Sequence, residues 1–284
     1  MAIGGNPVFN GKTFRSAARG TSPAAYGTTT FAGQSALNQQ QLEHMYNRPA
    51  AGPAETGRMT YDDVIVKTIL SIAVVLVGAA IPVFLVPGLA PVLMVVGLIG
   101  GLVLGLVNSF KREPVPGLIL AYSALEGLFL GGITMFLEAS FPGIAIQALL
   151  GTLTVFGVTL ALFKSGKVRA TPKAMKFFMI AMLSYLAFSL INLGLMAFNL
   201  NDNPWGLRSE EFLGTGIPFG VIIGIFAIGL AAFSLIIDFT QIDEAVKHGA
   251  PQRYSWTAAF GLTVTLIWLY VEFLRLIAIL RGDE

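Results

Sequence analysis

The chain has 284 residues, of which 55% are hydrophobic and only 12% are charged, and its net charge is +2. Because this charged fraction is about half the usual value, it cannot cover a water-exposed globule of this size, which excludes a water-soluble enzyme, a nucleic-acid binder and a disordered chain. The absence of cysteine excludes disulfides, thiolate metal sites and cysteine nucleophiles. An integral membrane protein remains, with the lipid bilayer as its first partner and with no nucleic-acid partner.

Residues 1–58 differ in composition from the rest of the chain. They are rich in Gly, Ala, Ser, Thr, Asn and Gln, and they contain too few large apolar side chains to offset the entropy cost of ordering. No apolar segment of the signal-peptide kind follows Met1, and the first long apolar run begins only after Asp63. The sequence therefore predicts a disordered, polar, cytoplasmic tail at residues 1–58 and a transmembrane domain at residues 59–284.

Seven apolar stretches follow one another after Tyr61, separated by short breaks that contain polar residues, Pro or Gly. Each is long enough to cross a hydrocarbon core of ~30 Å as a helix of about 20 residues. A helix satisfies its own backbone hydrogen bonds, so the sequence predicts an all-α membrane protein, a bundle of seven transmembrane helices. The spans are expected at residues 64–86, 90–110, 115–137, 142–163, 174–198, 212–238 and 256–280.

Lysine and arginine predict the orientation of this bundle. All but three of the 18 basic residues fall in the tail, at the entry to the first helix, and around the second-to-third, fourth-to-fifth and sixth-to-seventh loops. The exceptions are Arg208, Arg275 and Arg281. Because basic loops stay in the cytoplasm, we expect the N-terminus inside and the C-terminus outside. The absence of cysteine, together with an unprocessed N-terminus, favours a bacterial plasma membrane.

Glycines at four-residue spacing mark helices whose backbones approach each other closely. They occur in the second, third and sixth spans, which we therefore expect to pack together. The residues are Gly97, Gly101 and Gly105, then Gly127 and Gly131, then Gly216, Gly220 and Gly224.

Three carboxylates lie inside or at the end of these spans, where each costs at least ~2.5–3.5 kcal/mol at the bilayer centre. Glu126 lies in the middle of the third span, Asp238 closes the sixth at its cytoplasmic end, and Glu272 lies toward the outer end of the seventh. Such a ladder by depth suits a path for cations or protons. No hydrolase, metalloprotease or nucleotide-binding motif accompanies it, so we expect neither an enzyme nor a bound metal or cofactor.

Each acid also has a plainer interpretation. Glu272 is one helical turn from Arg275, and the two side chains can simply neutralise each other. Asp238 is expected at the same depth as Lys111 and Arg112, and either cation can pair with it, as a structural contact or as a breakable gate at the inner mouth of a channel. Glu126 has no cation three or four residues away, so a structural role explains it least well.

Three segments carry a resemblance to a known family: AYSALEGLFLGG in the third span, FSLIIDFTQI at the end of the sixth, and LIWLYVEFLRLIAIL in the seventh. They resemble the Bax-inhibitor, YccA-like family of seven-helix membrane proteins, also called the transmembrane Bax-inhibitor-motif family. The resemblance covers about residues 60–284. It implies a bundle with the sixth helix near its centre and, in several members, a pH-sensitive calcium leak.

The resemblance also implies site residues. In the family, an aspartate at the end of the sixth helix pairs with an aspartate in the seventh, and a basic residue after the second helix latches them closed. Asp238 matches the first aspartate, and Lys111 or Arg112 matches the basic residue. In the seventh helix two alignments are possible, which place the second acid at Glu272 or replace it with Thr265.

Two functions follow as hypotheses. The first is a passive, proton-modulated cation leak with Ca²⁺ as the permeant ion, in which Glu126 takes part of the role of the missing acid. The second is a non-catalytic modulator of a membrane-bound protease or another membrane protein, because some members of the family restrain such a protease. The tail and the cytoplasmic loops would then make the contact.

Overall fold

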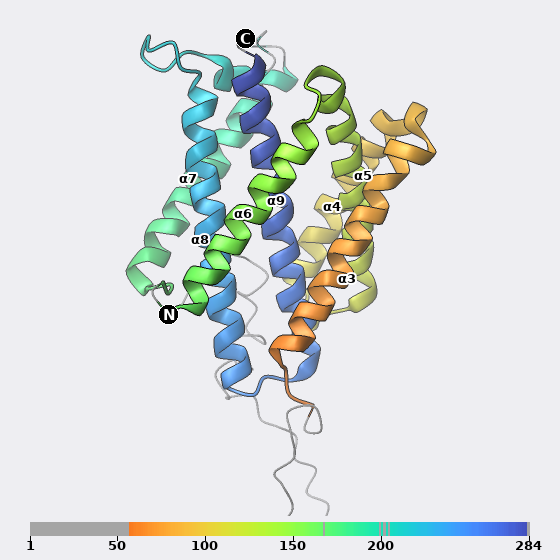
Figure 1. Cartoon of the computed structure of the whole chain (residues 1–284), viewed down its shortest axis with the longest axis vertical. Coiled ribbons are helices and arrows are strands. Elements are labelled where there is room, and N and C mark those ends of the chain that lie inside the picture. Colours follow the sequence, from red (N-terminus) through yellow and green to blue (C-terminus); the bar gives the residue numbers. More distant parts are fainter. Residues whose placement is uncertain (1–56, 167, 199, 201–202, 204, 283–284) are drawn as a thin grey trace, which may run out of the picture.

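The computed structural model describes residues 57–282, except 167, 199, 201–202 and 204. The tail predicted at residues 1–58 therefore lies outside the described residues, apart from its last two. The described residues contain seven helices that are long and apolar enough to cross a membrane, and no β-strand beyond isolated bridges. The predicted fold class, an all-α membrane protein with seven spans, is confirmed (Figure 1).

Proline and capping residues explain where several of these helices begin. Thr60 caps the first helix through a reciprocal pair of hydrogen bonds with Asp63. Pro116 and Pro172 each occupy the first position of a helix, where their missing N–H costs nothing. The long helices are α3 (Tyr61–Ala80, continued by the π-helical turn η2, Ile81–Leu85), α4 (Ala90–Phe110), α5 (Pro116–Ser140), α6 (Ile144–Lys164), α7 (Pro172–Ala197), α8 (Phe219–Lys247) and α9 (Ser255–Gly282), with short 3-10 turns η3 (Pro87–Leu89), η4 (Gly206–Ser209) and η5 (Gln252–Tyr254).

The sixth span differs from the prediction at both ends. It was expected at residues 212–238, whereas α8 begins at Phe219 and continues to Lys247. The segment before it forms a turn, in which the Phe212 amide donates to the Ile217 carbonyl and Gly216 has a positive φ of 71°. Polar residues beyond position 238 continue the helix, because helix formation does not end where hydropathy falls. Asp238 therefore lies inside α8 and not at its end.

Helices α8 and α9 form the buried centre of the bundle. In each of their apolar windows 56% of the residues are buried, against 17–39% in the other five spans. Helix α9 contacts α3, α5, α6 and α8, while α8 packs on α6, α7 and α9. Figure 1 shows α9 running between the other helices. The expected central position of the sixth helix is confirmed, and the seventh shares it.

Glycines bring α3, α4 and α5 into close contact. A Cβ atom at Gly127 would lie 2.3 Å from the Val75 carbonyl oxygen of α3, and one at Gly97 would lie 2.5 Å from backbone atoms of α5. The expectation that the sixth span joins this group is wrong. Gly224 of α8 faces Leu276 of α9, Gly220 faces Ile279 of α9 and Arg208 of η4, and Gly216 precedes the helix. Glycine spacing marks a face for close approach but does not specify which helix occupies it.

We predict that Gly127→Ala destabilises the fold, because the added methyl group meets the backbone of α3, which cannot move aside as a side chain can. The expected loss is about 1–3 kcal/mol of unfolding free energy. Gly157→Ala in α6 is the control, since a Cβ there has no neighbour within 4 Å and removal of glycine from a helix stabilises by up to about 1 kcal/mol. Thermal unfolding in detergent measures both, and equal effects would contradict the packing described.

Candidate functional site: buried acids along α8 and α9

Asp238 is enclosed between α8 and α9. Its side chain has 0% exposure, and its Oδ2 accepts a hydrogen bond of 2.7 Å from the hydroxyl of Thr265, which is 3% exposed. Leu235 and Leu269, both fully buried, belong to the apolar core of these two helices. A carboxylate is thus held inside the largest apolar cluster, with a hydroxyl donor from the neighbouring helix.

This contact distinguishes the two possible alignments of the seventh helix. Thr265 is the residue of α9 that meets Asp238. Glu272 follows seven residues later, two helical turns or about 10 Å further along the same face of α9. Of these two residues of α9, the one that contacts Asp238 is Thr265, through its hydroxyl.

Glu272 is the centre of a second buried polar cluster. It is 1% exposed, and its two carboxylate oxygens accept hydrogen bonds of 2.9 and 3.0 Å from the Arg275 guanidinium. The indole N–H of Trp268 donates to the same carboxylate at 3.1 Å. The hydroxyl of Tyr185, on α7, donates to it too. The ion pair expected from the spacing of Glu272 and Arg275 is present.

Arg208 is a member of this cluster that the sequence analysis missed. It was expected in an outer loop, yet it is only 3% exposed and donates to the Tyr185 hydroxyl at 3.3 Å and to Ser189 at 3.1 Å. Its guanidinium also lies over the rings of Tyr185 and Phe188. Within the described part of the chain, Nη1 of Arg208 has no hydrogen-bond partner. Arg275 thus pairs directly with the Glu272 carboxylate, and Arg208 is linked to it through the Tyr185 hydroxyl.

Asn192 of α7 explains how a loop arginine becomes buried. Its side-chain oxygen accepts from the Leu207 amide at 2.7 Å, and its amide group donates to the Trp205 carbonyl at 3.2 Å. These two bonds hold η4 against α7, and Gly206 makes the turn with a positive φ of 61°. A buried asparagine in an apolar span was the available signal, because a polar group in a span needs a partner.

Glu126 lies apart from the other two acids. It is half-buried on α5 and lies against Gly101 of α4. A Cβ added at Gly101 would be only 2.6 Å from the Glu126 Oε1 atom. The carboxylate also lies beside the Tyr122 hydroxyl, one turn earlier on α5. The structure thus places Glu126 between α4 and α5, whereas Asp238 and Glu272 lie along α8 and α9. The three acids expected in one ladder occupy two different helix interfaces.

Lys111 and Arg112 lie at the end of α4 and in the turn that follows. Both are exposed, while Asp238 has no exposed surface and takes its 2.7 Å hydrogen bond from Thr265. The adjacent Glu113 forms a 3.1 Å ion pair with Arg253, which joins this turn to the loop between α8 and α9. The latch between either cation and Asp238 stays a prediction.

We predict that Thr265→Val destabilises the protein by about 1–3 kcal/mol, because it removes a donor to a buried carboxylate while keeping a similar side-chain shape. Thr263→Val is the matched control on the same helix. Thr263 is equally buried, but its hydroxyl bonds only to the Ala259 carbonyl of its own helix at 2.8 Å. Chemical unfolding of the two variants in detergent should separate them, and a larger loss for Thr263→Val would contradict this assignment.

We also predict that Arg275→Met is strongly destabilising, by about 3–5 kcal/mol, because it leaves the Glu272 carboxylate buried without its ion-pair partner. The double variant Glu272→Gln with Arg275→Met should recover part of that loss, since the uncompensated charge is gone. Arg281→Met is the control, because Arg281 lies near the surface, where it donates to the Pro142 carbonyl and lies over the Phe141 ring, and it forms no ion pair within the described part of the chain. A double-mutant cycle measured by thermal unfolding tests this, and strict additivity would refute the coupling.

Comparison with known families supports the resemblance carried by the motifs. A family model described as Bax inhibitor 1 like matches residues 6–282, so the match begins well before the segment in which the motifs lie. No curated protein matches the chain. On the extent of the family match, the chain belongs to the Bax inhibitor 1 like family.

Proposed function

We propose that this protein is a passive cation leak, with Ca²⁺ as the permeant ion, whose flux depends on the protonation of Asp238. The observation that carries this proposal is a fully buried carboxylate between the two central helices, bonded to a hydroxyl of the other helix. Keeping such a group in a membrane domain is costly, so its position calls for a cation that passes or lodges beside it.

The chemistry of the site fits a hard cation. Carboxylate and hydroxyl oxygens are ligands that Ca²⁺ accepts, and Asp238 and Thr265 offer both. Seven residues further along the same face of α9, Glu272 offers a second carboxylate. The resemblance to proteins with a pH-sensitive calcium leak supports the same assignment.

The proton dependence follows from the charge of Asp238. The ionised carboxylate attracts a cation and accepts a hydrogen bond from the Thr265 hydroxyl. The protonated acid has no net charge, and its own O–H is a hydrogen-bond donor. We therefore assign the change in flux to this carboxylate. Glu126, in its separate interface, is proposed as a second titrating group.

The cluster around Glu272 is proposed as the closed end of this path. Its carboxylate is already paired with Arg275, and the Arg208 guanidinium lies nearby on Tyr185. A cation reaching Glu272 has to displace Arg275. In the proposed orientation this end faces outside, together with the C-terminus, while the end rich in lysine and arginine faces the cytoplasm of a bacterial cell.

The test is calcium flux into liposomes that contain the purified full chain and an enclosed calcium dye, measured from about pH 6 to 8. Wild-type flux is expected to vary several-fold over this range. Asp238→Asn is expected to remove most of this variation, because an amide does not ionise over the same pH range. Glu113→Gln is the control, since it removes an exposed carboxylate. Glu126→Gln shows whether the second acid contributes to the variation.

Absence of flux at every pH would refute the leak. The alternative, a non-catalytic modulator of a membrane-bound protease, would then be tested by pull-down with and without residues 1–58. A leak should survive this deletion, whereas a contact made by the tail should not.

A further inference from the structure

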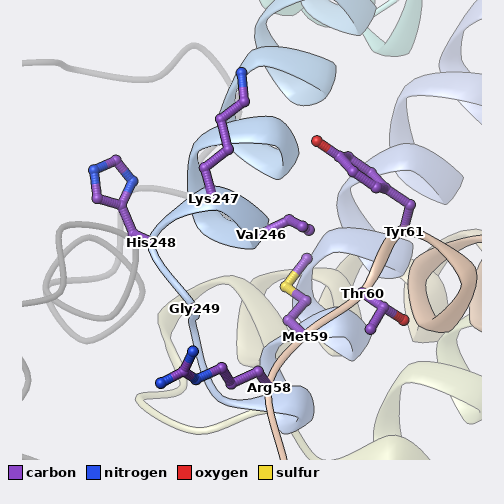
Figure 2. Close-up of a pocket in the computed structure, with 8 residues that line it drawn as sticks. All are labelled: Arg58, Met59, Thr60, Tyr61, Val246, Lys247, His248 and Gly249. Carbon is purple, nitrogen blue, oxygen red and sulfur yellow. The ribbon is translucent and has the colours of Figure 1, made fainter. Parts of the chain in front are cut away.

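A pocket of about 390 Å³ opens where the chain enters α3 and leaves α8 (Figure 2). This is the end of the bundle that carries most of the lysine and arginine residues. It lies far from the Glu272 cluster, and no step of the proposed leak uses it. The lining residues are Arg58, Met59, Thr60, Tyr61, Val246, Lys247, His248 and Gly249.

Backbone pairing fixes the walls of this pocket. The Met59 amide donates to the Ala250 carbonyl at 2.7 Å, and the Gln252 amide donates to the Gly57 carbonyl at 2.8 Å. Residues 57–59 therefore lie against the turn that follows α8, and Thr60 then caps α3. The pocket is formed by two chain segments held in register, 57–61 and 246–249, so its cationic side chains project from a fixed frame.

The lining of the pocket is cationic. It includes Arg58, Lys247 and an imidazole, that of His248, but no carboxylate. The acid that lies behind it, Asp243, is already engaged: one oxygen accepts from Lys247 at 2.7 Å and the other from the Tyr61 hydroxyl at 2.6 Å. The surplus positive charge therefore has no acidic partner among the lining residues.

Arg58 is the side chain best placed to take an anion. It extends across the turn, so that a Cβ at Gly249 would lie 3.3–3.4 Å from its side-chain atoms. Among the described residues its guanidinium has no ion-pair partner, and it is exposed to the pocket. Figure 2 shows Arg58 and His248 around the turn at Gly249, with Lys247 above them. The Lys247 ammonium points away from Arg58 and is paired with Asp243 (Figure 2). A guanidinium fork by itself recognises phosphate oxygens in a bidentate manner.

An apolar stripe on α3 begins at this pocket. Tyr61, Ile65 and Ile69 follow one another at four-residue spacing, so they share one face of the helix, and they are 46%, 53% and 63% exposed. In a membrane-spanning helix such a face contacts lipid chains. A phosphate in the pocket that Arg58 and Tyr61 both line would thus have an apolar helix face for acyl chains at the edge of the pocket, which favours a phospholipid over a free phosphate ion.

We propose that this pocket binds the phosphate of an anionic phospholipid headgroup, with Arg58 as its ligand and the Tyr61–Ile69 stripe as the contact for an acyl chain. The site is independent of the proposed leak. A bound lipid would join the entry to α3 with the end of α8, the helix that carries Asp238.

The experiment uses the purified full chain and native mass spectrometry, with titration of phosphatidylglycerol or, in parallel, phosphatidylcholine. The wild-type protein is expected to retain phosphatidylglycerol in preference. Arg58→Gln should weaken that binding about tenfold or more, because it removes charge-assisted hydrogen bonds to the phosphate. Arg58→Gln breaks no ion pair among the described residues, so a loss of lipid binding is not a consequence of a broken salt bridge.

The control is the double variant Lys173→Gln with Lys176→Gln, which removes two exposed cations at the same end of the bundle without touching the pocket. It should bind phosphatidylglycerol as the wild type does. Equal loss in the control and in Arg58→Gln would overturn the proposal, since it would show general charge attraction. A third arm adds inorganic phosphate: if this ion alone displaces the bound lipid at low millimolar concentration, the pocket takes a soluble phosphate and the lipid assignment is wrong.

Discussion

The packing of α8 against α9 is the constraint on which the rest of the structure depends. Both helices carry small, fully buried side chains, such as Ala231 and Ala258, that belong to the same core cluster. The other helices then cover this pair. A polar group inside such a contact has no water, so it needs a partner from the facing helix. Thr265 supplies that partner to Asp238.

The same helix pair separates two electrostatic environments. Near the end of α9 the Glu272 carboxylate is paired with Arg275, so its charge is neutralised where water is scarce, and Arg208 joins the same cluster through Tyr185. At the other end Arg58 faces an open pocket whose lining has no carboxylate, while Lys247 is paired with Asp243 behind it. Asp238 lies between these environments. A cation that moves along α9 would leave the oxygen ligands of Asp238 and Thr265. It would then meet Glu272, whose carboxylate is already paired with Arg275.

Helices α3, α4 and α5 pack in a different way, through close contacts between their backbones. Their glycines allow backbone to meet backbone, which requires no hydrophobic driving force in lipid. Gly101 also makes room for the Glu126 carboxylate, so a packing residue and an ionisable residue depend on each other there. This layer presents much apolar surface to lipid, whereas α8 and α9 keep theirs inside.

The sequence by itself determined the seven spans, because every helix in lipid must satisfy its own backbone and needs a fixed apolar length. It also predicted the pair of Glu272 with Arg275, which is local to one helical turn. Only the tertiary structure decided that Thr265 faces Asp238, that Arg208 is buried and that Glu126 lies in another interface. Those facts depend on which helices are neighbours and on how each helix is rotated about its axis. Hydropathy predicts neither, because a span in lipid is apolar on nearly every face.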